Sequence, residues 1–289
     1  MYPNAMSAGL PRIAAGNCAQ GGAWIRRLLR YALYAFVLLH ACAARAEFDH
    51  THKHWTKLLQ HNVVPLNEYK SSAVRYGELG SHSAQHALDW YLGALSAVPV
   101  TAYNEWTRAQ QLAFLINAYN AYTIKMVLTY YPVNSLKDAV GADGDPWRRE
   151  FFDLLGSRRS VAEVESELIG AFEEPRAHFA LSCAAVDCPA LRNEAYVADR
   201  LDQQLEEQAR RFMADGARNR YDAKSNTVHV SRIFDWHARD FERSAGSVKA
   251  YVARYADALT GAPKDGTAWT AKSFDLDYLP YDWKLNDAR

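Results

Sequence analysis

Two cysteines and a histidine are the residues of this chain whose types and spacing best suit covalent chemistry. His178 lies five residues before Cys183, and Cys188 follows Cys183 by another five. A cysteine becomes a nucleophile when it is ionised and a base lies within hydrogen-bond reach, at about 2.6–3.2 Å. Cys183 is therefore a candidate nucleophile, and His178 its candidate base, in a thiol hydrolase or acyltransferase.

The backbone expected for this segment argues against a direct pairing of the two side chains. The run from His178 to Cys183 is short and apolar and follows Pro175, which predicts a buried strand. Five residues along a strand place two side chains on opposite faces and roughly 16 Å apart, at about 3.3 Å per residue. Cys183 would then need a base from elsewhere, for example His229 on a later hairpin.

A disulfide between Cys183 and Cys188 is the favoured alternative. It requires residues 184–187 to fold back as a turn that brings the two Cα atoms within about 7 Å, and an oxidising compartment. A zinc site built from Cys183, Cys188 and His178 lacks the short Cys-x-x-Cys spacing of familiar sites. Two buried, inert thiols are the remaining alternative. We predict the disulfide, no metal site and no cofactor.

Three further polar residues join the candidate site. Asn117 and Asn120 lie one turn apart in an otherwise apolar helical segment, and a buried amide without partners costs on the order of 1–3 kcal/mol. They either orient a catalytic imidazole or tie the helix to a neighbouring loop. Asp235 lies where a strand is expected to give way to a helix, so it is a site residue or a helix N-cap. His178 itself is open to a purely structural role in the core.

Hydrophobic periodicity predicts the elements that position these residues. Apolar residues at three- and four-residue spacing predict helices, and a helix that is apolar on both sides belongs in the core. Ser160 followed by Glu163 is a capping box that begins a further short helix. The predicted helices cover 82–96, 108–130, 197–212 and 247–259, and the predicted hairpins cover 150–161 and 221–233. The class is mixed α/β (α+β), with a helical half packed on a small, mostly antiparallel sheet.

The first 46 residues have the composition of an export signal. They contain five arginines and no acidic residue, then the apolar run 31–44, then the small-x-small pattern Ala44-Arg45-Ala46. We expect a signal peptide at 1–46, cleavage before Glu47, and one domain over 47–289 in a bacterial-type periplasmic or secreted protein. Lipidation at Cys42 and twin-arginine export through Arg26-Arg27 are the weaker alternatives.

Charge and composition narrow the classes of partner. The chain is 49% hydrophobic, as expected for a globular protein. Cleavage would leave 28 basic against 33 acidic residues, a net charge of −5. An acidic domain without a basic run is a poor binder of nucleic-acid phosphates, so we expect no nucleic acid partner. Its many aromatic residues suit a core, or a groove for a peptide, a glycan or another periplasmic protein.

Several long motifs resemble the domain-of-unknown-function family numbered 547. They lie at 115–125, 131–138, 178–196, 231–236, 240–241 and 281–286, so the resemblance covers roughly residues 55–287. It implies a secreted or periplasmic protein whose activity is not established. It also implies a fold similar to papain-like and transglutaminase-like hydrolases, in which a central helix carries the nucleophile. Here the helix with Asn117 and Asn120 would take that place without a cysteine, and His237 departs from the aromatic residue expected at its position.

The sequence therefore predicts an exported, disulfide-stabilised binding or scaffold module of unknown activity. A thiol hydrolase or acyltransferase-like enzyme with a papain-like or transglutaminase-like fold is the alternative. The candidate site residues are His178, Cys183, Asn117, Asn120 and Asp235.

Overall fold

Helix α6, Arg108–Tyr130, forms the centre of the larger hydrophobic core in the computed structural model. The described residues are 47–139, 144–261, 269–270 and 272–288. The helix is buried along almost its whole length, as its two apolar sides predict. Thr107 and Gln110 begin it with a reciprocal capping box, and it ends at Tyr131, which a cis peptide bond joins to Pro132.

The chain from Phe48 onward forms one compact unit of mixed α+β structure, which confirms the predicted class. The helices are α2 Lys53–Asn62, α3 Tyr76–Leu79, α4 His82–Ser96, α5 Val100–Asn104, α6 Arg108–Tyr130, α7 Val161–Glu163, α8 Leu201–Met213, α9 Ile233–Trp236, α10 Ala238–Ala245, α11 Val248–Ala253 and α12 Ala256–Thr260. Shorter 3₁₀ turns are η1 Leu136–Asp138, η2 Pro146–Arg148, η4 Gly170–Phe172, η5 Pro175–Phe179 and η6 Ala198–Arg200, and η3 Val164–Ile169 is a π-helix. Among the described residues, no helix combines the length and apolarity needed to span a bilayer. The signal peptide expected at 1–46 lies outside the described residues.

The strands form three small sheets rather than one. The strands are β1 Val63–Leu66, β2 Ser71–Val74, β3 Phe152–Leu154, β4 Ser157–Arg159, β5 Arg220–Asp222, β6 Thr227–Val230 and β7 Asp275–Tyr278. The pairs β1–β2, β3–β4 and β5–β6 are antiparallel, and β7 extends the third sheet by pairing parallel to β6. The two predicted hairpins are present as β3–β4 and β5–β6. The first turns at Leu155-Gly156, both with positive φ, which suits the twist of a tight hairpin.

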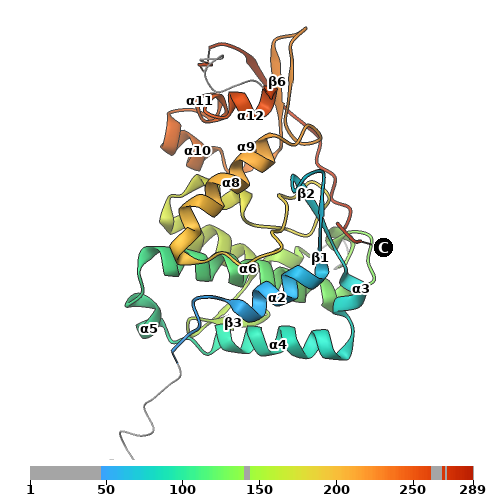
Figure 1. The fold of residues 1–289 in the computed structure, drawn as a ribbon, viewed down its shortest axis with the longest axis vertical. Coiled ribbons are helices and arrows are strands. Elements are labelled where there is room, and N and C mark those ends of the chain that lie inside the picture. Colours follow the sequence, from blue (N-terminus) through green and yellow to red (C-terminus); the bar gives the residue numbers. More distant parts are fainter. Residues whose placement is uncertain (1–46, 140–143, 262–268, 271, 289) are drawn as a thin grey trace, which may run out of the picture. The chain divides into compact units, whose positions relative to one another are not determined.

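The predicted helices at 82–96 and 108–130 are present with those bounds as α4 and α6. Helix α4 contacts both α2 and α6 and lies below them in Figure 1. The prediction at 197–212 corresponds to α8 preceded by a 3₁₀ turn. The prediction at 247–259 is divided between α11 and α12, because the backbone at Tyr255 leaves helical φ and ψ.

The strand predicted from His178 to Cys183 is wrong. Its first residues belong to the 3₁₀ turn η5, which begins at Pro175 and is capped by Glu174, whose side chain accepts a hydrogen bond from the Arg176 amide. The backbone that follows is bonded by a side chain instead of a strand, because Asn120 donates to the Ala180 carbonyl and accepts from the Ser182 amide, both at 2.9 Å. Tertiary hydrogen bonds from α6 thus replace a sheet ladder.

The segment after η5 joins two hydrophobic cores. The first surrounds α6 and includes Leu181, whereas Phe179 belongs to a second core that contains residues from α8, β6 and α10. In Figure 1, α8 lies between α6 and the helices α10–α12. Ala177 belongs to the first core as well, so the residues on either side of His178 pack into different cores and fix its backbone between them.

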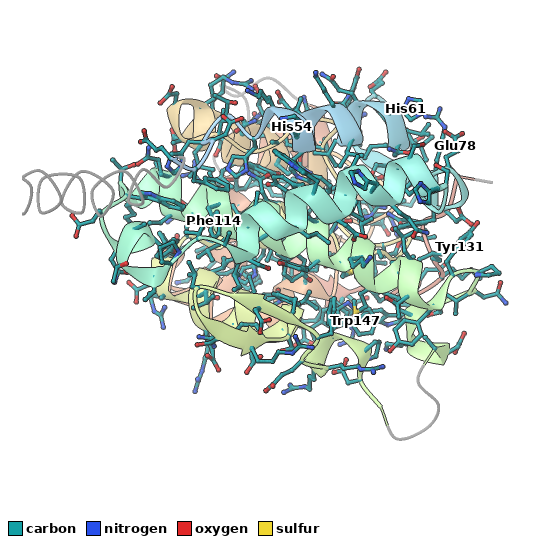
Figure 2. All side chains as sticks on the ribbon, turned by 90° about the horizontal axis from the view of Figure 1, so that it is seen from below. His54, His61, Glu78, Phe114, Tyr131 and Trp147 are labelled. Carbon is teal, nitrogen blue, oxygen red and sulfur yellow. A yellow bond between two sulfur atoms is a disulfide. The ribbon has the colours of Figure 1, made fainter. Side chains whose placement is uncertain are left out.

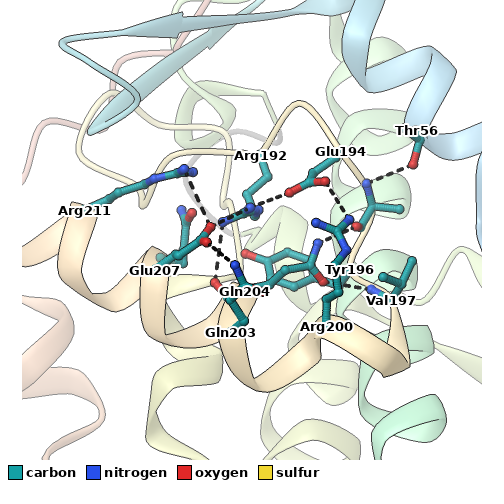
Figure 3. A network of polar contacts seen from close by, with 12 residues as sticks. Thr56, Arg192, Glu194, Tyr196, Val197, Arg200, Gln203, Gln204, Glu207 and Arg211 are labelled. Carbon is teal, nitrogen blue, oxygen red and sulfur yellow. Dashed lines mark hydrogen bonds and ion pairs between the residues drawn. The ribbon is translucent and has the colours of Figure 1, made fainter.

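A polar network fastens the loop at 189–197 to α8 (Figure 3). The buried guanidinium of Arg192 donates to Glu194 and to Glu207, the latter at 3.1 Å, and Arg200 donates to Glu194 at 2.8 Å. Gln204 donates to the Ala195 carbonyl at 2.9 Å. Burial raises the pKa of Glu194, but the two guanidiniums outweigh it and hold the pKa at about 2.

Replacing Asn120 by alanine should lower the free energy of unfolding by about 2–4 kcal/mol, because it leaves a buried carbonyl and a buried amide unpaired. Urea unfolding followed by circular dichroism measures the change. Asn104→Ala, at an exposed position in α5, is the matched control and should change it by about 0.5 kcal/mol or less. A loss below about 1 kcal/mol for Asn120→Ala would contradict the role of this amide.

Replacing Glu194 by glutamine should destabilise the protein at neutral pH and much less in acid. Since the pKa of Glu194 in the folded chain, about 2, is below its ordinary value, the stabilisation is present above about pH 4.5 and is lost as the pH falls towards 2. With allowance for screening, we expect about 1–2 kcal/mol at pH 7. Urea unfolding at pH 7 and pH 3 measures it, with exposed Glu105→Gln as control, and a difference independent of pH would be inconsistent with the ion pairs.

Candidate functional site

A cavity of about 510 Å³ lies beside α6 and brings aromatic and ionisable side chains together. Its large aromatic residues come from four separate segments and are Tyr119, Trp147, Trp236, Tyr281 and Trp283. A shallower hollow of about 800 Å³ adjoins it and shares Glu165, His178 and His237 with it. In Figure 2, Trp147 lies on one side of α6, whereas His54 and His61 of α2 lie on the other. The shared residues therefore mark the junction of two connected recesses.

Two imidazoles and two carboxylates form a cluster at this junction. His178 Nε2 donates to Asp240 Oδ2 at 2.8 Å, and His178 Nδ1 is 3.8 Å from Glu165 Oε1. His237 Nε2 is 3.4 Å from the same Glu165 oxygen. The two imidazole rings are stacked with their centroids 3.9 Å apart. His178 is 8% exposed, so this charge cluster is largely shielded from water.

Local backbone structure places Glu165, His237 and Asp240 around the junction of the two recesses. Ser160 and Glu163 form the predicted capping box, and the helix they begin widens into η3, which carries Glu165. Single π-type turns of this kind are frequent at functional sites. His237 lies at the junction of α9 and α10, and Asp240 lies in the first turn of α10. Residues distant in sequence thus meet because three helix ends converge.

The two carboxylates stay ionised despite their surroundings. Burial raises the pKa of Glu165, but His178, His237 and the hydroxyl of Tyr119 together hold that pKa below its ordinary value. The hydrogen bond from His178 lowers the pKa of Asp240. The cavity floor therefore presents negative charge.

The pKa values of the two imidazoles are shifted in opposite directions. Burial lowers the pKa of His178, but the hydrogen bond to Asp240 and the nearby negative charge of Glu165 outweigh burial and raise it overall. Burial, reinforced by the neighbouring His178, lowers the pKa of His237 to about 4. The pKa of one imidazole is thus raised and that of its stacked neighbour is lowered.

The predicted disulfide between Cys183 and Cys188 is present, with the Cα atoms 5.7 Å apart. Cys183 lines the cavity beside Tyr281, whose hydroxyl is 3.2 Å from Cys183 Sγ. His178 and Cys183 therefore reach the same cavity, which the strand prediction did not allow. The sulfur is bonded to Cys188, so it is not a thiolate in this oxidised form.

The loop closed by the disulfide holds the segment that supplies two of the aromatic walls. The Val186 amide donates to the Lys284 carbonyl at 2.8 Å, and the Asp282 amide donates to Asp187 Oδ2 at 2.6 Å. Trp283, on this segment, also lies under the ammonium of Lys137, 3.7 Å from the ring centroid. The positions of Tyr281 and Trp283 consequently depend on the disulfide loop.

The other predicted site residues lie outside the described lining of the cavity. Asn117 bonds both backbone groups of Tyr196, at 2.7 and 3.0 Å, so it ties a loop to α6 as Asn120 does. Asp235 is exposed and pairs with Arg232 at 2.8 Å. His229 pairs with Asp277 at 3.1 Å. Both asparagines therefore act on the cavity only indirectly, through the loops they hold.

Sequence reasoning missed Glu165, Asp240 and the importance of His237. Glu165 follows the capping box by two residues, so a helix there was predictable, but the face it turns to His178 was not. Asp240 belonged to a family motif, and His237 was noticed only as a departure from that motif. Spacing along the chain does not indicate that these three residues meet.

Comparison with known proteins finds one family model that is similar to part of the chain. No match was found among curated proteins, and none among solved structures. Three of the motifs, at 115–125, 131–138 and 178–196, fall within one matched segment, whereas those at 231–236 and 281–286 lie beyond it. Residues 103–213 match the family model described as "Protein of unknown function, DUF547", which confirms the resemblance drawn from the sequence.

Proposed function

We propose that the protein is an exported, disulfide-locked module that binds a glycan chain in the aromatic cavity. The observation that carries this proposal is the aromatic wall formed by Trp236, Tyr281 and Trp283. The ring centroid of Trp236 is 4.8 Å from that of Tyr281 and 5.4 Å from that of Trp283. Even so, 47% of the surface of Trp236 remains exposed to solvent. Large aromatic surface that is both ordered and solvent-accessible is typical of ligand recognition.

The polar groups of the cavity suit a ligand rich in hydroxyls. A sugar ring offers an apolar face for an aromatic side chain and hydroxyls that both donate and accept. The cavity provides acceptors in Asp145 and Glu165 and a donor in Arg148. Trp147 also lines it, and its buried indole Nε1 has no hydrogen-bond partner among the described residues. A ligand hydroxyl would pair this donor, which is otherwise costly to bury.

The disulfide supports the proposal through preorganisation. Tyr281 and Trp283 are held by backbone bonds to the loop that Cys183 and Cys188 close. A wall that is ordered before the ligand arrives loses less conformational entropy on binding. A short covalent loop is thus well suited to a binding site, where it fixes local geometry more than global stability.

A thiol hydrolase is the second candidate, because His178 and Cys183 line one cavity. That chemistry needs the disulfide reduced, since only a thiolate attacks a substrate carbonyl. His178 would then act as base, oriented by its hydrogen bond to Asp240. The oxidised loop favours the binding module over this enzyme.

The mass of the exported protein tests both export and the thiol state. We expect the purified periplasmic or secreted form to begin at Glu47, with no lipid on Cys42. Iodoacetamide without reductant should add no alkyl group, and after reduction it should add two, at Cys183 and Cys188. Free thiols in the exported form would instead support the hydrolase, and an intact N-terminus would contradict export.

Replacing Trp236 by alanine should weaken glycan binding at least tenfold, about 1.4 kcal/mol, because it removes a ring exposed to the ligand. Calorimetry with a β-1,4-linked N-acetylglucosamine hexamer measures the affinity. Trp90→Ala is the matched control, since Trp90 on α4 is 54% exposed and lies outside this cavity, and its affinity should not change. Binding of an extended hexapeptide but not the hexasaccharide, lost in Trp236→Ala, would replace the glycan by a peptide. Equal loss in both variants, or no binding of either probe, would end the proposal.

A further inference from the structure

We infer that Glu165, His178 and His237 form a binding site for a zinc ion at the floor of the cavity. Each residue offers one ligand atom, and the three atoms lie within 4.8 Å of one another. This inference is independent of glycan binding, because it rests on the cluster at the junction of the two recesses and not on the aromatic wall.

The spacing of the ligand atoms fits a tetrahedral zinc ion. Ligands bound at about 2.0–2.2 Å in tetrahedral geometry lie about 3.3 Å apart. Glu165 Oε1 is 3.4 Å from His237 Nε2 and 3.8 Å from His178 Nδ1. The two stacked imidazole rings would have to reorient around the ion to complete the geometry. Two imidazole nitrogens favour zinc over calcium or magnesium, which prefer oxygen ligands throughout.

The hydrogen bonds of His178 leave one nitrogen directed at the site. Its Nε2–H donates to Asp240 at 2.8 Å, whereas its buried Nδ1 has no hydrogen-bond partner among the described residues. Metal-bound histidines almost always donate their other nitrogen to a carboxylate or carbonyl, which fixes the tautomer and the ring. His178 with Asp240 already has this arrangement. An orphaned nitrogen in a side chain that is 8% exposed is the independent sign that a ligand is expected there.

The surroundings of Glu165 also suit a cation. Its carboxylate is packed against the Tyr119 hydroxyl and two imidazoles, and Asp240 adds a second negative charge behind His178. A partly enclosed carboxylate needs a positive partner to offset its lost hydration. The zinc alternative considered from the sequence shares only His178 with this site, because Cys183 and Cys188 are bonded to each other.

The site would be open on the cavity side. Three protein ligands leave a fourth position of a tetrahedral ion for water or for a group of a ligand, as in zinc sites that exchange their fourth ligand. All three residues line the cavity of about 510 Å³, so this position is accessible. A ligand in the cavity could then contact both the aromatic side chains and the ion held by Glu165, His178 and His237.

Zinc titration of the chelator-treated protein tests the inference. Calorimetry should show a site that is lost in His237→Phe, with at least a hundredfold fall in affinity, since phenylalanine keeps a ring stacked on His178 but offers no nitrogen. Asp240→Asn should retain the stoichiometry and weaken binding by about 10–100-fold. Cobalt in place of zinc should give visible absorption bands in the wild type that His237→Phe lacks, whereas calcium should not bind at this site.

His229→Phe is the matched control, because His229 also pairs with a carboxylate, Asp277, but lies outside the cluster. It should bind zinc as the wild type does. Circular dichroism confirms folding, and if His237→Phe is unfolded the zinc affinity of Asp240→Asn decides the question. Zinc affinity that is equal in the wild type and His237→Phe, or equal in the wild type and Asp240→Asn, would overturn the site. All of these titrations omit glycan, so their failure leaves the proposed function untouched.

Discussion

The whole site depends on the hydrogen bonds by which Asn120 holds the backbone from Ala180 to Ser182. A short apolar segment without a neighbouring strand would leave buried amides and carbonyls unpaired, at a cost of about 1–3 kcal/mol for each. One side chain of α6 bonds both a carbonyl and an amide of this segment. Because the backbone is fixed there, Phe179 and Leu181 can pack into different cores, and His178 and Cys183 face one cavity.

Burial of charge at the cavity floor follows from that placement. His178 is shielded from water, so its position is tolerable only because Asp240 and Glu165 approach it. Those two carboxylates come from η3 and α10, which are far apart in sequence but converge on η5. The charges therefore link elements of both cores, and removing any one of them would leave its partners buried and uncompensated.

Sequence patterns predicted the elements whose signals are local. They failed for segments whose backbone conformation is set by tertiary hydrogen bonds. Helices 82–96 and 108–130 were predictable because their apolar spacing extends over several turns, and the Ser160–Glu163 capping box identified a helix start. The Cys183–Cys188 pair was predictable because an oxidising compartment favours a bond between the two cysteines that follow the expected signal peptide. The run 178–183 has no periodicity that separates a strand from an irregular segment, so the bonds from Asn120 determined its structure. Glu165, His237 and Asp240 could not be grouped, since nothing local to them reports their convergence.

The disulfide and the charge cluster have different effects on the chemistry of the cavity. The disulfide removes a nucleophile, whereas the cluster retains groups that can transfer protons or bind cations. With Cys183 bonded to Cys188, the groups at the cavity that can still transfer protons or bind cations are the imidazoles of His178 and His237 and the carboxylates near them. The same covalent loop holds Tyr281 and Trp283 in place, so oxidation removes a nucleophile and orders a wall at once. A reduced loop would reverse both effects, because freeing the Cys183 thiol would also loosen the segment that carries the aromatic side chains. Ligand recognition and thiol chemistry are for this reason competing states of one cavity.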